Sequence, residues 1–329
     1  MPEDARIDGA RAEGTSHRSA NPSAVSFSVD LDVSEVEARG FDCSSDEARY
    51  VIERIGMHRL SFYLPLAYWN SRNDRPSLTE AHDLMTYDRR VQSIVLKYVG
   101  VFETQLRARY AREMSAEHGE MSLYDPGMFR DEGRYRSAMK DVERELSRQS
   151  RRCREIRECV ESGRKVPIST AVEYMSLGTL SKLFSNTNDT GIVARIAGVF
   201  NVSTSKARGW FRTVADVRNA CAHFNPYIVR KQIPTTPMRI VGCEMSNRSP
   251  FYIFPMLHTM LSSEQAARFD DRNLDYAQRM VEDMTAHTIG FARCYMATAQ
   301  AIDVPTMFLD PSSGSWKGAR QEDYEDFRR

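Results

Sequence analysis

The chain has 329 residues, of which 41% are hydrophobic, and its 45 basic residues balance its 45 acidic ones, so its formal net charge is zero. This length can bury a large core, while zero net charge excludes a long-range attraction of the whole molecule for a polyanion. No apolar run is long enough to cross a bilayer, and the charged start of the chain lacks the apolar stretch of a secretion signal. We therefore expect a cytoplasmic protein with no membrane contact.

The spacing of the six cysteines and seven histidines argues against structural disulfides and metal sites. No two cysteines are separated by two residues, and no two histidines by three. These are the spacings that zinc knuckles and helical zinc sites use. We expect reduced thiols, no metal and no cofactor.

The first third of the chain changes from polar to strongly helical. Residues 1–25 hold almost no large apolar side chains and are predicted to be disordered, because little burial would offset the entropy of ordering them. An apolar-alternating piece over 27–33 follows. A helix begins near Ser44–Glu47, where serine and aspartate can cap it. An aromatic segment over 56–66 and a polar loop over 70–76 come next.

The strongest helical pattern of the chain runs from Thr79 to Glu113. Its apolar residues recur at intervals of three and four, as one buried helix face requires, and they are Leu84, Tyr87, Val91, Ile94, Val95, Tyr98, Phe102, Leu106 and Tyr110. Glu103 and Arg107 are spaced for an intrahelical ion pair.

Four more helices are predicted downstream. They cover 134–161, 168–184 with an interruption at Gly178, 192–200, and 204–223. Serine and glycine at 162–163 end the first of these, and Asn225-Pro226 follows the last, where proline cannot continue a helix.

The C-terminal part combines an irregular region with two last helices. Residues 232–253 are rich in proline and β-branched side chains and are interpreted as a loop with room for a short hairpin, ahead of helices near 254–263 and 272–301. Strand signals are few, so the fold class is all-α. We divide the chain into a disordered segment over 1–25, a helical domain over 26–302 and a polar tail over 303–329.

A short motif, Arg218-Asn219 followed by His223, ends the helix predicted over 204–223. Each helical residue advances about 100°, so Asn219 and His223 lie about 40° apart, and Arg218 lies about 140° from His223. RNA carries its own nucleophile, the 2′-hydroxyl, so cleavage needs only a base, an acid and charge stabilisation. An imidazole can serve as base or acid near neutral pH, and a guanidinium can neutralise the transition-state phosphate. Arg218, Asn219 and His223 are therefore the predicted catalytic residues.

The same motif also has a structural interpretation. Arg218 and Asn219 could brace neighbouring helices, and His223 would then be a hydrogen-bonded residue at a helix C-terminus, where the dipole favours a cation. A short motif alone favours this interpretation, because such patterns often occur by chance.

Several basic and aromatic residues are weaker candidates for RNA contacts. Buried polar residues in apolar helices more often join helices than bind ligands, so RNA contacts by Arg59, Arg107 and Arg109 are a secondary prediction. Just beyond the motif, Tyr227, Arg230 and Lys231 form a basic-aromatic cluster that could stack on a base and contact phosphate, or could equally be a solvated loop. The charged segment over 148–165 is interpreted as a solvated helix face with ion pairs four residues apart.

Four blocks of residues, in this order along the chain, carry a family resemblance. They are Arg59-Leu60-Ser61 with Tyr63; Tyr87-Asp88-Arg89; Pro167-Ile168 with Glu173, Ser176-Leu177-Gly178-Thr179-Leu180-Ser181 and Leu183-Phe184; and Trp210 with Val217-Arg218-Asn219 and Cys221-Ala222-His223. Together they resemble the bacterial abortive-infection (Abi) proteins of the D and F types, over residues 35 to 300. Four ordered blocks strengthen the catalytic interpretation of the motif, since chance rarely produces them together.

The resemblance implies membership of the HEPN superfamily: an all-α HEPN-like bundle with additional helices and few or no strands. Many members are homodimeric, metal-independent endoribonucleases that act as toxins or in antiphage defence, and some associate with a small non-coding RNA. The implied products are 2′,3′-cyclic phosphate and 5′-hydroxyl ends. Because one helix supplies one histidine, a two-fold dimer would provide both acid and base.

One position departs from the family, and one competing function stays open. Relatives commonly carry a second histidine directly after the motif histidine, where this chain has Phe224, which puts in doubt only an accessory role of that second histidine. The competing function is a non-catalytic RNA-binding or toxin–antitoxin interaction module.

Overall fold

The computed structural model describes residues 33–38, 40–70, 75–230, 233, 235–240, 247–261, 307–310 and 315–318. These ranges hold twelve α-helices and one small antiparallel hairpin, so the predicted all-α fold is confirmed. The predicted disordered segment over 1–25, the helix near 272–301 and Lys231 lie outside the described residues. None of the described helices is long and apolar enough to span a membrane.

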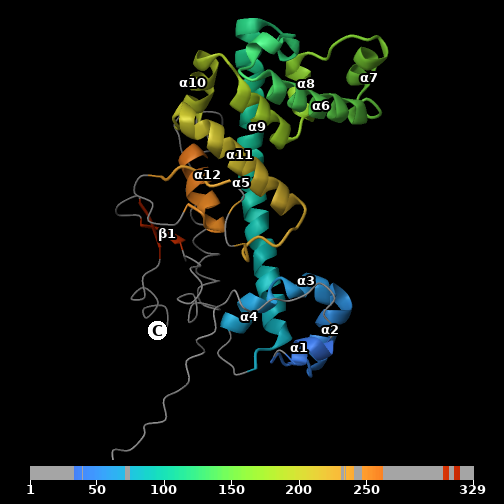
Figure 1. Ribbon diagram of the computed structural model, residues 1–329, viewed down its shortest axis with the longest axis vertical. Helices are drawn as coiled ribbons and strands as arrows, with labels where there is room; N and C mark the ends of the chain where they lie inside the picture. The colour runs from blue at the N-terminus through green and yellow to red at the C-terminus, as the bar shows by residue number, and fades with distance from the viewer. Residues whose placement is uncertain are drawn as a thin grey trace, which may run out of the picture.

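One helix, α5 (Leu78–His118), organises the molecule. At about 1.5 Å per residue its 41 residues extend about 60 Å, and Figure 1 shows the other helices arranged along it. It begins at a capping box in which Ser77 and Glu80 bond each other's backbone N–H groups. Its apolar residues, from Leu84 to Met114, are buried along the whole length. The helix predicted over 79–113 is thus confirmed and is longer at its C-terminal end.

Three short helices lie against the N-terminal part of α5, and they are α2 (Asp46–Ile55), α3 (Met57–Ser61) and α4 (Leu64–Asn70). The short helix α1 (Val33–Ala38) precedes them along the chain. The side chain of Ser45 caps α2 by accepting from the backbone N–H of Ala48, as the sequence predicts. Gly56 separates α2 from α3 at a φ of +82°, a conformation that glycine adopts without strain.

The helix predicted over 134–161 is two helices. α6 (Glu132–Gln149) ends at Ser150, and α7 (Arg154–Glu161) begins after Cys153. Their junction is a tight turn in which the N–H groups of Arg152 and Cys153 both donate to the carbonyl of Gln149, at 2.8 Å. The single-helix prediction failed because residues 150–153 contain neither glycine nor proline to mark the break.

The helix predicted over 168–184 is also divided, but not at Gly178. α8 (Ile168–Tyr174) and α9 (Leu177–Asn186) are separated by Met175 and Ser176. The side chain of Ser176 caps α9 by accepting from the N–H of Thr179. Gly178 therefore lies in the first turn of α9 rather than at an interruption.

The remaining helices build the layer that carries the motif. These are α10 (Thr190–Val199), α11 (Thr204–Ala222) and α12 (Ile253–Leu261), and α11 packs against α5, α9, α10 and α12. Buried aromatic rings of Phe102, Phe184, Phe200 and Phe211 meet between α5, α9 and α11, with centroids 4.7–5.2 Å apart. The motif helix is thus fixed on several sides.

Short 3₁₀ turns and one hairpin complete the described chain. The turns are Ser122–Tyr124, Pro126–Met128 and Pro250–Tyr252. The hairpin pairs β1 (Met307–Asp310) with β2 (Ser315–Gly318), with Leu309 opposite Trp316. It falls within the segment predicted as a polar tail, where the sequence analysis expected no strand.

Candidate active site at the end of α11

His223 lies where α11 ends, with its side chain exposed to solvent. It occupies the C-cap position (φ −92°, ψ 7°), and its N–H still donates to the carbonyl of Asn219 at 3.1 Å. Among the described residues, nothing accepts from or donates to the imidazole. The ring is therefore free to meet a substrate at the C-terminal end of α11.

The residue after the histidine turns the chain sharply. Phe224 has a φ of +51°, in the left-handed region that non-glycine residues seldom adopt. Arg59, on α3, donates from Nη2 to the carbonyl of Phe224, and Gln92, on α5, donates from Nε2 to the carbonyl of Asn225 at 3.0 Å. Side chains from two other helices thus hold the turn that ends the motif.

A buried carboxylate, Asp88 on α5, fixes the next two residues. Its Oδ2 accepts from the hydroxyl of Tyr63 at 2.6 Å and from the N–H of Tyr227 at 2.7 Å, while its Oδ1 accepts from the N–H of Ile228 at 3.1 Å. Burial raises the pKa of Asp88, although these three donors act to lower it. Asp88, a residue of the second family block, thus binds the segment that follows His223.

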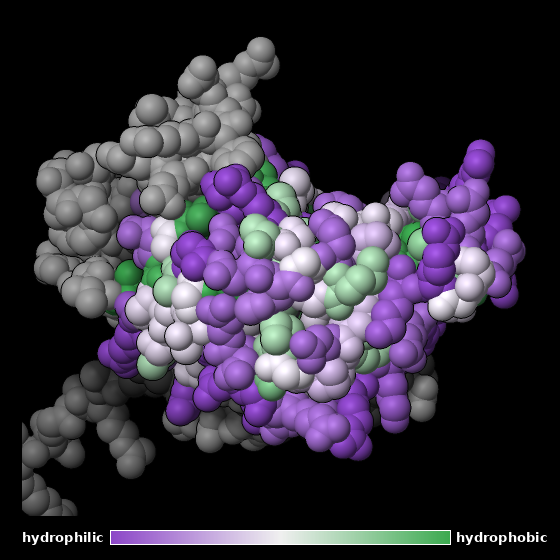
Figure 2. All heavy atoms as spheres, turned by 90° about the horizontal axis from the view of Figure 1, so that it is seen from above, coloured by the Kyte–Doolittle hydropathy of each residue, from purple (hydrophilic) through white to green (hydrophobic). Residues whose placement is uncertain are grey.

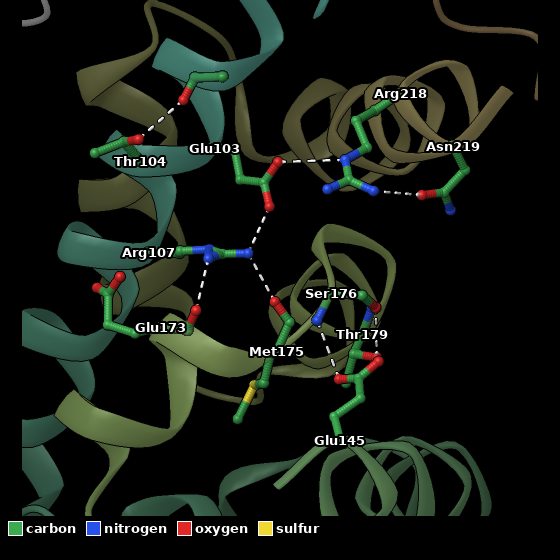
Figure 3. A network of polar contacts seen from close by, with 11 residues as sticks. Glu103, Thr104, Arg107, Glu145, Glu173, Met175, Ser176, Thr179, Arg218 and Asn219 are labelled. Atoms are coloured by element: carbon green, nitrogen blue, oxygen red, sulfur yellow. Dashed lines mark hydrogen bonds and ion pairs between the residues drawn. The ribbon is translucent and has the colours of Figure 1, made fainter. Parts of the chain in front are cut away.

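Arg218, the first motif residue, is held by an acidic residue of α5. Its Nε lies 3.5 Å from Oε2 of Glu103, and its Nη1 lies 3.4 Å from Oδ1 of Asn219. Figure 3 shows the guanidinium between these two oxygens. Arg218 is about one third exposed, so its guanidinium is oriented by protein contacts and still reaches solvent.

Glu103 also accepts from Arg107, which completes a network between α5, α8 and α11 (Figure 3). Nη2 of Arg107 lies 2.5 Å from Oε1 of Glu103, which confirms the predicted intrahelical pair. The same guanidinium donates to the carbonyls of Glu173 and Met175, at 2.9 and 2.7 Å, at the C-terminal end of α8. Arg107 thus joins helices and orients Glu103.

The α8–α9 junction is held from its other side by Glu145 on α6. The two carboxylate oxygens of Glu145 accept from the N–H of Ser176 and from the hydroxyl of Thr179, both at 3.0 Å. Sequence reasoning missed Glu145, because its surroundings on a polar helix gave no signal. A continuous set of polar contacts therefore runs from α6 through the α8–α9 junction to Arg218.

Gly178 lies next to the second motif residue. A Cβ atom added at Gly178 would be 3.8 Å from Nδ2 of Asn219, which is ordinary contact distance. A side chain of one carbon would therefore fit at this position, and the packing of α9 against α11 does not require a glycine here.

The adjacent thiol, Cys221, takes no part in the exposed chemistry. It is completely buried, and burial raises its pKa to about 12. A thiol with that pKa is protonated at neutral pH and is a poor nucleophile. Of Cys221 and His223, only His223 is exposed to solvent.

The weaker RNA-contact candidates occupy different surroundings. Tyr227 is completely buried and donates its hydroxyl to the carbonyl of Pro250, so its ring offers no surface for base stacking. Arg230 donates from Nε to the carbonyl of Pro226 at 3.0 Å. Arg109 is half-buried on α5. Arg59 and Arg107 bind backbone carbonyls, as described above. Sequence reasoning grouped these residues by charge, and the fold gives most of them bracing contacts.

Among the described residues, no three histidine, cysteine, aspartate or glutamate side chains cluster in a way that could hold a metal ion. The groups around Arg218 and His223 are a cation, an amide and an imidazole. This set can bind an anion and transfer a proton.

Comparison with known proteins places the chain in a family. The family model for Abi-like proteins matches residues 50–228, more than half of the chain. The chain belongs to the Abi-like protein family. The matched region runs from α2 to the end of the Asp88-bound segment and so contains both Arg59 and the whole motif. Searches of curated proteins and of solved structures found no match.

Proposed function

We propose that this Abi-like protein is a metal-independent endoribonuclease of the HEPN type that acts in abortive infection. The observation that carries the proposal is the end of α11. There, Arg218 is oriented by Glu103 at 3.5 Å, and the exposed imidazole of His223 projects from a turn that Arg59, Gln92 and Asp88 hold in place. Membership of the Abi-like family supports the defence role.

In the proposed reaction the 2′-oxygen of a ribose attacks the adjacent phosphorus, and the bond from phosphorus to the 5′-oxygen breaks. One imidazole accepts the proton of the 2′-hydroxyl, and a protonated imidazole donates a proton to the leaving 5′-oxygen. The Arg218 guanidinium binds the non-bridging oxygens and offsets their increased charge. Asn219 donates to a phosphate oxygen or orients the imidazole. The products carry 2′,3′-cyclic phosphate and 5′-hydroxyl ends.

The reaction calls for an acid and a base, whereas each chain contributes one motif histidine. We propose that a homodimer brings two α11 ends together, so that the two His223 side chains share the roles. His223 lies at an exposed helix end, a position that a second chain can approach.

The decisive experiment compares His223→Ala and Arg218→Ala with His118→Ala. His118 is a matched control because it is also a partly exposed histidine near a helix end, paired with Asp189 at 3.1 Å, and belongs to no part of the motif. We expect the two motif variants to lose RNA cleavage by at least about a hundredfold, the scale of a lost general acid–base group, with unchanged melting temperatures. Cleavage should persist in EDTA, and sequencing should recover 5′-hydroxyl RNA ends only with active protein.

Cleavage that survives in both folded motif variants would overturn the catalytic assignment. Co-purified RNA with intact ends, together with growth arrest that persists in His223→Ala cells, would instead support a non-catalytic RNA-binding module. Loss of cleavage on addition of EDTA would contradict a metal-independent reaction.

A further inference from the structure

The turn between α6 and α7 carries exposed arginines that the motif does not use. Arg148, Arg151 and Arg152 are all exposed, and none of their guanidinium groups has a partner among the described residues. We call these three residues the arginine turn. Residues 148–165 as a whole contain seven basic and three acidic side chains. A chain with no net charge thus concentrates positive charge at one place.

The ion pairing expected of a solvated helix face is mostly missing here. Arg154 pairs with Glu158 at 2.7 Å, at the spacing of four residues that this interpretation requires. The equivalent partners, Arg151 with Glu155 and Arg157 with Glu161, form no ion pair. The charges of the arginine turn are consequently not neutralised by the acidic residues of α7.

The backbone beneath the arginine turn is fixed. Arg157 donates from Nε to the carbonyl of Ser150 and from Nη2 to that of Arg151, both at 3.0 Å. Ile156 is completely buried and anchors α7 in the core. Because the turn is already ordered, ligand binding would cost only the ordering of the arginine side chains.

Arg148, the first residue of the arginine turn, lies on the same helix as a residue that contacts the motif region. Arg148 is one helical turn after Glu145, which holds Ser176 and Thr179 beside Gly178 and Asn219. In Figure 1, α7 lies at the outer edge of the molecule, beyond α6 and α8. Figure 2 shows a mostly hydrophilic surface at this edge. A long ligand could therefore contact the arginine turn and the motif together.

We propose that the arginine turn binds the phosphate backbone of RNA and holds long RNA substrates beside Arg218 and His223. Arginine forks match phosphate oxygens, and such contacts fix position without reading sequence. A protein partner would call for an apolar centre, whereas this edge is mostly polar. The inference rests on the proposed ribonuclease function for the identity of the ligand.

The test measures binding of a fluorescent single-stranded 30-nucleotide RNA to His223→Ala protein at several salt concentrations. The variant Arg148→Ala/Arg151→Ala/Arg152→Ala is compared with Arg49→Ala/Arg54→Ala/Arg90→Ala, which removes the same charge near α2 and the start of α5. Losing three phosphate contacts should make the slope of log K against log salt shallower by about two, and weaken binding about tenfold at 0.15 M salt. The control variant should change neither quantity.

A second measurement separates this inference from the proposed function. With His223 intact, the arginine-turn variant should cleave a tetranucleotide at the wild-type rate and a long RNA much more slowly. Wild-type protein that binds RNA through the arginine turn but cleaves none would refute the ribonuclease and leave the surface standing. Wild-type cleavage with equal RNA affinity in both triple variants would refute the surface alone.

A second variant tests whether weaker RNA binding arises from misfolding rather than from lost phosphate contacts. Arg151→Glu/Arg152→Glu alters only the exposed turn and leaves the α6 helix unchanged. It should weaken RNA binding further than alanine does, because it adds repulsion, while keeping the wild-type melting temperature. RNA affinity equal to that of the parent protein would overturn the proposal.

Discussion

We expect the conformation of the segment that follows His223 to depend on Asp88 more than on any other side chain. Its two oxygens accept three hydrogen bonds, two of them from backbone N–H groups. In Asp88→Asn, an amide NH₂ group replaces one of the two carboxylate oxygens. This NH₂ is itself a donor and cannot accept the hydrogen bond that the oxygen accepted. We expect the free energy of unfolding to fall by about 2 kcal/mol, measured by urea titration, because a buried donor loses its partner. Asp83→Asn, on the same helix and exposed, should stay within about 0.5 kcal/mol of wild type.

The same carboxyl predicts how stability depends on pH. Because burial raises the pKa of Asp88 above 3.8, the native chain keeps this proton at pH values where the unfolded chain has released it. The resulting stabilisation is fully present below about pH 4 and is lost as the pH rises through the native pKa. Asp88→Asn lacks this step. The difference in melting temperature between wild type and variant should therefore change across the acid range, and a constant difference would contradict a raised pKa.

The sequence alone predicted the motif residues, but it did not predict which side chains hold the motif in place. Arg218, Asn219 and His223 could be named from spacing and from the ordered family blocks, because both are properties of the sequence. The partners of the segment after His223 could not, since Arg59, Asp88 and Gln92 are separated from it by more than 130 residues. Tyr227 shows the opposite failure: an aromatic residue beside basic ones suggested base stacking, yet the fold buries it.

Among the helices, the contact of α5 with α11 through Glu103 offers a sharp test. Glu103 and Glu113 are both on α5, both accept from an arginine of another helix, and have side chains 12% and 18% exposed. We expect Glu103→Gln to lower the free energy of unfolding by about 1–3 kcal/mol, because its ion pair with Arg107 is largely buried. Glu113→Gln should lower it by about 1 kcal/mol or less, because Arg195 is about half exposed.

The rate of RNA cleavage should differ between Glu103→Gln and Glu113→Gln. Glu103→Gln removes the charge that orients Arg218, so the rate of single-turnover RNA cleavage should fall about tenfold or more, mainly in kcat. Glu113→Gln leaves Arg218 untouched and should cleave RNA at the wild-type rate once differences in stability are allowed for. Equal rates in both variants would indicate that Glu103 only stabilises the bundle.

The ends of helices show how far sequence patterns predict this fold. The start of α2 was predicted within 44–47 with serine or aspartate as the cap, because such a residue directly before a periodic apolar face is a strong signal; the structure identifies the cap as Ser45. The breaks at 150–153 and 175–176 were missed. The first arises from backbone hydrogen bonds and from Arg157, and the second from Ser176 and Glu145, which only tertiary contacts bring together. Gly178 misled the prediction because a helix tolerates a single glycine without breaking.

For the molecule as a whole, the described helices place the motif and the arginine turn on different elements that share one polar network. The long α5 contributes Asp88 and Gln92 to the turn after His223, and Glu103 and Arg107 to the contacts of Arg218. One continuous helix therefore contacts both Arg218 and the turn after His223, and so fixes their positions relative to each other. This arrangement leaves the exposed imidazole as the group that can meet a second chain.

The proposed sharing of two His223 side chains predicts the behaviour of a mixed dimer. Wild-type and His223→Ala chains carrying different tags would be co-expressed, and the heterodimer isolated by two affinity steps. If one site needs both imidazoles, the heterodimer should retain less than about a tenth of wild-type cleavage, since either the acid or the base is missing. A heterodimer with His118→Ala should be fully active. Half of the wild-type activity in the His223→Ala heterodimer would mean that each chain carries a complete site, and failure to recover any heterodimer would contradict the dimer itself.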